Sequence, residues 1–154
     1  MAALYLSLGT NQGDRKKALE TAAEYISERI GRIVRLSAVY ETEPWGFESS
    51  NLFLNQVLCV DTTLNATEIL NLTQQIEKIM GRESKSSNGV YSDRVIDIDI
   101  LLYNDFCIQT DRLTIPHPLM QDRRFVLEPL AEIAANVVHP IIGKTIKELL
   151  EQAD

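Results

Sequence analysis

Cysteine, proline and glycine are scarce in this sequence of 154 residues, which contains two, five and seven of them. The two cysteines form no Cys-x-x-Cys pattern, so nothing indicates a disulfide framework or a zinc site. The N-terminus has neither a basic leader nor an apolar run long enough to span a membrane. We therefore expect a cytoplasmic protein that folds without disulfides or a structural metal.

Positive charge is also in deficit, because 15 Lys and Arg face 22 Asp and Glu and leave a net charge of −7. Nucleic-acid-binding domains are usually net basic, and anionic membranes attract basic segments. The composition therefore argues against nucleic acid and membranes as partners. Five of the nine arginines nevertheless fall close together, which leaves room for a local anion site: Arg82, Arg94, Arg112, Arg123 and Arg124.

The apolar pattern predicts six core elements in the order β-α-β-β-α-β. Strands are expected over 3–9, 33–40, 52–61 and 95–103, and helices over 14–30 and 67–80. Asn65 followed by Glu68 predicts an N-cap with a capping box for the second helix. The order is typical of an α+β, ferredoxin-like βαββαβ core, an antiparallel sheet with helices. Short C-terminal helices near 127–135 and 145–152 complete a single domain over residues 1–154.

The sharpest local feature is the acidic pair in the last expected strand, VIDIDILLY. Side chains alternate across a strand, so Asp97 and Asp99 should share one face, about 6.6 Å apart along the backbone. The opposite, core face should hold Ile96, Ile98, Ile100 and Leu102. Magnesium commonly takes one or two carboxylates plus substrate phosphates. A solvated polar face is the alternative, and Asp-x-Asp alone is common enough to favour it, but the nearby arginines favour a nucleotide–magnesium site.

The two histidines have different surroundings. His117 lies between two prolines, whose rigid rings would hold it in place to donate to a phosphate or leaving group. His139 stands in an apolar stretch, where a structural role is expected. The Gly143–Lys144–Thr145 run lacks the first glycine of a P-loop, because Val138 occupies that position, and is interpreted as a coincidence.

Aromatic side chains are concentrated beside a turn-rich segment. Trp45 and Phe47 lie in this segment, and Phe53 begins the next strand. They could simply cap the core, which is the commoner case. They could also enclose a flat heterocycle, with the Asn55 amide supplying donors and an acceptor to its edge.

Separated motifs in one order resemble a single family, the 6-hydroxymethyl-7,8-dihydropterin pyrophosphokinases of folate biosynthesis. The matching segments are LSLGTNQGD at 6–14, YETEPWG at 40–46, FLNQV at 53–57, DRVIDIDILLYN at 93–104, RLTIPHP at 112–118 and RRFVLEPLAEIA at 123–134. The resemblance implies a magnesium-dependent transferase that moves pyrophosphate from ATP to the pterin hydroxymethyl group and releases AMP. It further implies two Mg²⁺ ions and ATP as co-substrate. We also expect a monomer, although the sequence itself does not define the oligomeric state.

The same resemblance implies roles for individual residues. Asp97 and Asp99 would bind the magnesium ions, and Arg82 and Arg94 would be catalytic-loop arginines. The ATP contacts would be Gln74, Glu77, Arg112, His117 and Arg123. The pterin pocket would comprise Thr42, Pro44, Trp45, Phe53, Asn55 and Phe125.

Two other functions are compatible with parts of this pattern. Ferredoxin-like sheets also present aromatic residues to single-stranded RNA, but the acidic composition and the lack of an RNP-type aromatic run argue against such a binding module. An Asp-x-Asp pair with a metal also serves nucleotide-sugar transfer, for which this chain is short. Following the resemblance, we expect the pterin hydroxyl to attack the β-phosphorus of ATP, with residues 82–94 closing over the site.

Overall fold

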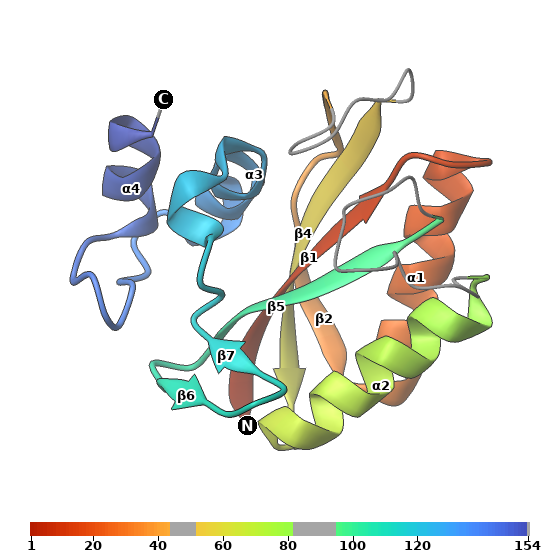
Figure 1. Cartoon of the computed structure of the whole chain (residues 1–154), viewed down its shortest axis with the longest axis horizontal. Helices are drawn as coiled ribbons and strands as arrows, with labels where there is room; N and C mark the ends of the chain where they lie inside the picture. Colours follow the sequence, from red (N-terminus) through yellow and green to blue (C-terminus); the bar gives the residue numbers. More distant parts are fainter. Residues whose placement is uncertain (44–51, 82–94, 154) are drawn as a thin grey trace.

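The computed structural model describes residues 1–43, 52–81 and 95–153 (Figure 1). In chain order, its elements are β1 (Ala2–Thr10), α1 (Arg15–Arg29), β2 (Arg32–Leu36), β3 (Tyr40–Thr42), β4 (Phe53–Thr62), α2 (Ala66–Ile79), β5 (Asp97–Tyr103), β6 (Ile108–Gln109), β7 (Thr114–Ile115), a 3₁₀ turn (Met120–Asp122), α3 (Arg124–Ala134) and α4 (Ile146–Gln152).

The central sheet is antiparallel and has the strand order β2-β4-β1-β5, with β3 paired to β4. Helices α1 and α2 cover one face, and α3 and α4 lie on the other (Figure 1). Strands β1, β2, β4 and β5 with helices α1 and α2 form the βαββαβ arrangement. The predicted α+β, ferredoxin-like fold with additional C-terminal helices is therefore confirmed.

Each face of the sheet carries an apolar core. On the α1–α2 side, Leu4, Leu6 and Leu8 of β1 pack with Ile26 and Ile76 of the two helices. The core on the α3–α4 side contains Tyr5, Cys59 and Leu102 from the sheet, together with Leu127 and Leu130 of α3. Alternate residues of the same strands thus supply the two cores.

The strand expected over 33–40 is wrong as a single element. Ser37 lies at the break: its backbone N–H donates to the Val57 carbonyl at 3.0 Å, and its hydroxyl accepts from the Val57 N–H at 2.9 Å. The hydroxyl thereby takes the place of a backbone acceptor. The chain turns there, so β2 ends at Leu36 and β3 begins at Tyr40, and both pair with β4.

Leu102 lies on the opposite face from the one expected. Tyr5 pairs with Leu102 but Leu6 pairs with Ile100, which leaves Leu101 as an extra residue in β5. Such a bulge reverses the side-chain alternation beyond it. Leu102 consequently joins the α3–α4 core, whereas Ile96, Ile98 and Ile100 remain in the α1–α2 core.

Helix ends follow local sequence signals. The capping box of Asn65 and Glu68 is present at α2, and Thr145 and Glu148 form another at α4. Thr145 therefore serves as a helix cap. The helix expected near 127–135 begins earlier, at Arg124, and the β6–β7 hairpin was not predicted from sequence. Within the described ranges, every helix is too short or too polar to cross a bilayer.

Candidate active site

A strip of small and polar residues crosses β4, β1 and β5 on the α3–α4 face. Gly9 pairs with Asn55 on one side and with Asp97 on the other, and Ser7 pairs with Asp99. We call Ser7, Gly9, Asn55, Asp97 and Asp99 the polar strip. A methyl group on Gly9 would lie in ordinary van der Waals contact with the Asn55 Oδ1 atom, at 3.5 Å, and would occupy space at the centre of the strip.

Arg123 approaches the strip from the N-cap of α3. Its Nη1 atom lies 3.8 Å from Asp99 Oδ2, and its guanidinium carbon lies 5.6 Å from the centre of the Phe125 ring. The Arg123 side chain is only 5% exposed, against 31% for Asp99. A buried guanidinium needs such partners, so both contacts hold its charge beside Asp99.

The two aspartates offer an incomplete donor set for a metal. In the part of the chain that the structure describes, no group of three or more His, Cys, Asp or Glu side chains is placed to hold a metal ion. A structural metal would require more protein ligands. Two carboxylates on a rigid strand instead fit Mg²⁺ that completes its shell with substrate oxygens and water.

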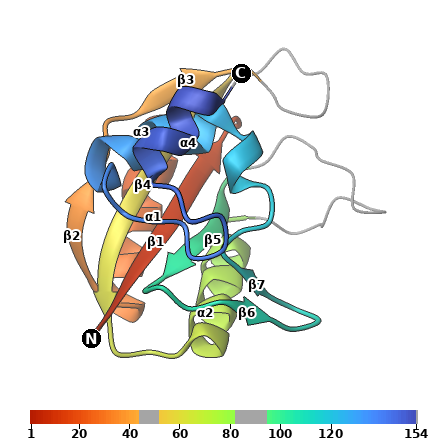
Figure 2. The ribbon, with the colours of Figure 1, turned by 90° about the vertical axis from the view of Figure 1, so that its left-hand side faces the viewer.

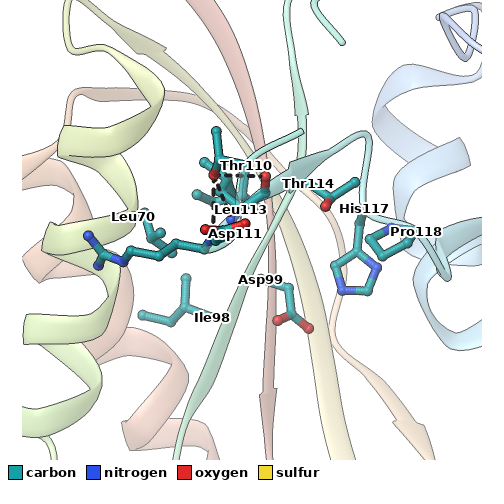
Figure 3. Close-up of a pocket in the computed structure, with 11 residues that line it drawn as sticks. Leu70, Ile98, Asp99, Thr110, Asp111, Leu113, Thr114, His117 and Pro118 are labelled. Atoms are coloured by element: carbon teal, nitrogen blue, oxygen red, sulfur yellow. Dashed lines mark hydrogen bonds between the residues drawn. The ribbon is translucent and has the colours of Figure 1, made fainter. Parts of the chain in front are cut away.

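A pocket of about 280 Å³ lies along the outer edge of β5 (Figure 3). This volume is close to the lower limit for small-molecule sites, ~300 Å³. In the close-up, the Asp99 carboxylate and the His117 ring point to the same side of the pocket, while Leu70 and Ile98 line its α2 side. The lining residues are Leu70, Ile98, Asp99, Ile100, Thr110, Asp111, Arg112, Leu113, Thr114, His117 and Pro118.

Helix α2 supplies polar contacts to this pocket. The Arg112 Nη2 atom donates to Asn71 Oδ1 at 2.9 Å and to Gln74 Oε1 at 3.2 Å. Glu77, which is buried, accepts the backbone N–H of Ile98 through Oε2 at 2.8 Å. The residues expected to contact ATP on α2 are therefore adjacent to the pocket walls.

His117 is a neutral hydrogen-bond donor at physiological pH. Burial, aided by the Arg123 charge, lowers its pKa to about 4, although Asp97 opposes the shift. Its Nδ1 atom accepts the Leu119 N–H at 3.2 Å, so the ring proton resides on Nε2. His117 can thus donate one hydrogen bond without adding positive charge.

Thr42, Phe53 and Asn55 are gathered by the pairing of β3 with β4. Thr42 lies opposite Phe53, and the Asn55 Nδ2 atom donates to Thr42 Oγ1 at 2.7 Å. That bond directs the amide oxygen of the buried Asn55 toward Gly9. Phe125 lies in the first turn of α3, and its contact with Arg123 links it to the aspartates.

Some expected site residues cannot be compared with the structure. Pro44, Trp45, Arg82 and Arg94 lie outside the described residues. Among the described ones, sequence reasoning missed Leu70, Thr110, Leu113 and Thr114 as pocket-lining residues. The short β6–β7 hairpin presents the last three, and its two-residue strands give almost no periodic signal.

A family profile and individual proteins of known sequence show the same similarity to this chain. The family profile described as 7,8-dihydro-6-hydroxymethylpterin-pyrophosphokinase (HPPK) matches residues 5–135. The chain is 50% identical over 135 residues to 2-amino-4-hydroxy-6-hydroxymethyldihydropteridine pyrophosphokinase of Porphyromonas gingivalis, covering 87% of this chain and 92% of the relative. The enzyme of the same name from Aquifex aeolicus is 45% identical over 148 residues, or 96% of this chain and 90% of the relative.

Solved structures show the same fold. Plasmodium falciparum HPPK-DHPS with SDX-DHP superposes with a TM-score of 0.79 at 20% identity and covers 99% of this chain. This chain spans only 43% of that longer protein, so the likeness concerns one part of it.

Proposed function

Because the chain belongs to the 7,8-dihydro-6-hydroxymethylpterin-pyrophosphokinase family and is a pyrophosphokinase of folate biosynthesis, we propose that ATP binds along the outer edge of β5 and the pterin beside Asn55. The observation that carries this assignment is the polar strip, since it joins the two regions across three strands. Asp97 and Asp99 lie where the triphosphate and the pterin hydroxymethyl group would meet.

The β5-edge pocket suits the nucleotide because apolar walls and polar groups converge there. Leu70 and Ile98 would contact the base, while Arg112, held by Gln74 on α2, would supply positive charge. Glu77 would keep α2 against β5 through its bond to Ile98. His117 and Arg123 would reach the phosphates, one as a neutral donor and the other as a fixed cation.

The pterin would lie between aromatic rings and an amide. Phe53 and Phe125 provide flat apolar surfaces, and Asn55 and Thr42 provide hydrogen-bonding groups at one edge. By family resemblance, Pro44 and Trp45 would complete the proposed pocket. This combination of rings and one oriented amide suits a flat, polar-edged heterocycle.

Asp97 and Asp99 would hold two Mg²⁺ ions together with ATP oxygens. When bound, magnesium neutralises triphosphate charge and lowers the pKa of the attacking hydroxyl. Arg123 would stabilise charge that develops on the transferred group, because Asp99 and Phe125 already fix its position. Arg82 and Arg94 are proposed to add further positive charge.

The proposed reaction is an in-line displacement at the β-phosphorus of ATP. The pterin hydroxyl oxygen forms a new bond to the β-phosphorus, its proton passes to solvent, and the bond between the β-phosphorus and the oxygen that bridges to the α-phosphorus breaks, which releases AMP. No covalent enzyme intermediate is required. Catalysis then consists of aligning two substrates and stabilising charge.

One domain over residues 1–154 would carry the whole reaction, acting as a monomer. In support, the profile match extends over residues 5–135, and α3, which continues the site, packs directly on the sheet. ATP, magnesium and the pterin would be its partners.

Calorimetric titration tests these site assignments. A non-hydrolysable ATP analogue should bind far more tightly with magnesium than without it, and a pterin ligand should then bind more tightly to the nucleotide complex. Asp97→Asn/Asp99→Asn should bind the analogue equally with and without magnesium. If this double variant retained the full magnesium dependence, the proposed metal site would be wrong, while the family activity would stand.

A further inference from the structure

The short strand β3 carries one of the residues of the proposed pterin pocket. It contains only Tyr40, Glu41 and Thr42, and among the described strands it pairs with β4 alone. Its residue Thr42 accepts the 2.7 Å hydrogen bond that orients the Asn55 amide. Because three residues paired on one side form few ladder bonds, other contacts must help to hold β3 in place.

Glu132 of α3 supplies such contacts. Its two carboxylate oxygens accept the Ala38 N–H at 2.9 and 3.2 Å, and Oε1 also accepts the Tyr40 hydroxyl at 2.7 Å. The bond to Glu132 is the largest cause that raises the pKa of Tyr40 to about 12. One carboxylate therefore holds both the entry to β3 and its first residue.

The same helix carries the opposite wall of the proposed pterin pocket. Phe125 lies in the first turn of α3, and Glu132 lies two turns further along. Helix α3 contacts β3 directly, and Figure 2 shows the two elements alongside each other. Pro129 removes one backbone hydrogen bond between these two residues, but the helix is continuous from Arg124 to Ala134, so a bond at Glu132 constrains β3 relative to Phe125.

We propose that Glu132 is a positioning residue for the pterin substrate: through Ala38 and Tyr40 it sets the spacing between the Thr42–Asn55 pair and Phe125. This inference rests on the proposed pterin pocket. Glu132 touches no reacting group, so it should affect binding of one substrate more than the chemical step.

Two conservative substitutions test the role. Glu132→Gln retains one acceptor oxygen but loses the charge, and Tyr40→Phe removes only the hydroxyl. Each should raise KM for the pterin by about 3- to 10-fold, which is less than the direct loss of a hydrogen bond to a charged group, because Glu132 is exposed and acts on the pocket only through β3. KM for ATP and kcat should stay within about twofold. The pterin Kd, titrated in the presence of a non-hydrolysable ATP analogue, should rise in parallel.

The double variant Glu132→Gln/Tyr40→Phe distinguishes the loss of one shared hydrogen bond from general destabilisation of the fold. If the two groups act through one hydrogen bond, the combined rise in pterin KM should be smaller than the product of the single effects. Glu128→Gln is the matched control for the lost charge, because this residue lies one turn earlier on α3 and its charge also acts on Tyr40, but its carboxylate is hydrogen-bonded to Arg124 at 2.6 Å. It should leave both KM values unchanged.

Equal rises in the KM values for both substrates, or a lower melting temperature with unchanged KM values, would overturn the inference. If Glu132→Gln fails to fold, Tyr40→Phe decides the matter alone. Asn55→Ala separates the two proposals. If it raises pterin KM and Glu132→Gln does not, the inference fails and the pocket stands. If Asn55→Ala leaves pterin KM unchanged, the proposed pocket itself is wrong.

Discussion

The two faces of β1, β4 and β5 are built from alternate residues of the same strands, but they differ in how far their apolar cores extend. On the α1–α2 side, apolar residues continue along the strands from Leu4 to Leu8 and from Ile96 to Ile100. On the α3–α4 side, the apolar core includes Tyr5 and Leu102, while the polar strip occupies the adjoining positions. The proposed active site therefore lies where the second core gives way to polar residues, and the first core can stabilise it from behind.

The largest effect that we expect is a loss of turnover caused by a substitution in the polar strip. Asp97→Ala should reduce kcat by about 10³-fold or more, because a proposed ligand of the charge-neutralising magnesium ions is lost. Its melting temperature should change little, because the carboxylate is partly exposed and outside both cores. AMP release and thermal unfolding measure the two quantities.

Asp105→Ala is the matched control, since this exposed aspartate follows β5 in the turn. It removes the same charge without touching the strip. If Asp97→Ala and Asp105→Ala had comparable turnover, Asp97 would not belong to the catalytic site.

Ile96 directly precedes Asp97 but faces the α1–α2 core, so its substitution should affect stability more than turnover. Ile96 is completely buried in the α1–α2 core. Ile96→Ala should lower the free energy of unfolding by about 2–5 kcal/mol, whereas Ile96→Val should cost only about 0.5–1.5 kcal/mol. Denaturant unfolding gives both values.

The kcat of Ile96→Val, measured well below its melting temperature, should remain close to that of the unaltered enzyme. A large loss of kcat in this stable variant would mean that the two faces are not functionally separate.

The smallest effect that we expect is a change in the pH dependence of stability, which involves His139 in the α3–α4 layer. His139 is buried, its Nδ1 atom accepts the N–H groups of Ile141 and Ile142 at 3.2 and 3.1 Å, and burial lowers its pKa from 6.5. A lowered pKa in the folded state means that the unfolded chain takes up the proton first. The stability associated with His139 is thus complete above about pH 6.5 and declines as pH falls through the folded-state pKa.

His139→Asn retains an acceptor for these N–H groups but does not titrate. The melting temperature should fall less between pH 7.5 and pH 5 in this variant than in the unaltered chain. Identical pH profiles would show that His139 contributes nothing to the pH dependence of stability.

The sequence predicted the framework well because its signals are local. The Asn65–Glu68 capping box and the alternation at 96–100 each depend on neighbouring residues, so they were identified correctly. The Leu101 bulge depends on how β5 pairs with β1 and could not be predicted from β5 itself. The break at Ser37 likewise depends on Val57, twenty residues away.

The candidate site was predicted less completely, for a similar reason. Asp97 and Asp99 stand out because strand alternation places them together. The contact between Arg112 and Gln74 joins a loop to a helix 38 residues earlier, and periodicity cannot reveal it. Neutral His117 also follows from burial and from Arg123, whose positions only the tertiary structure defines.

The bonds along the outer margin of β5 have another consequence. An exposed strand edge can recruit a strand from a second molecule and so begin aggregation. Here the Ile98 N–H is bonded to Glu77, and the Leu101 carbonyl accepts the His117 N–H at 3.0 Å. Two groups that a foreign strand would need are already occupied, so the contacts along the β5-edge pocket also leave fewer free backbone groups for pairing with a strand of a second molecule.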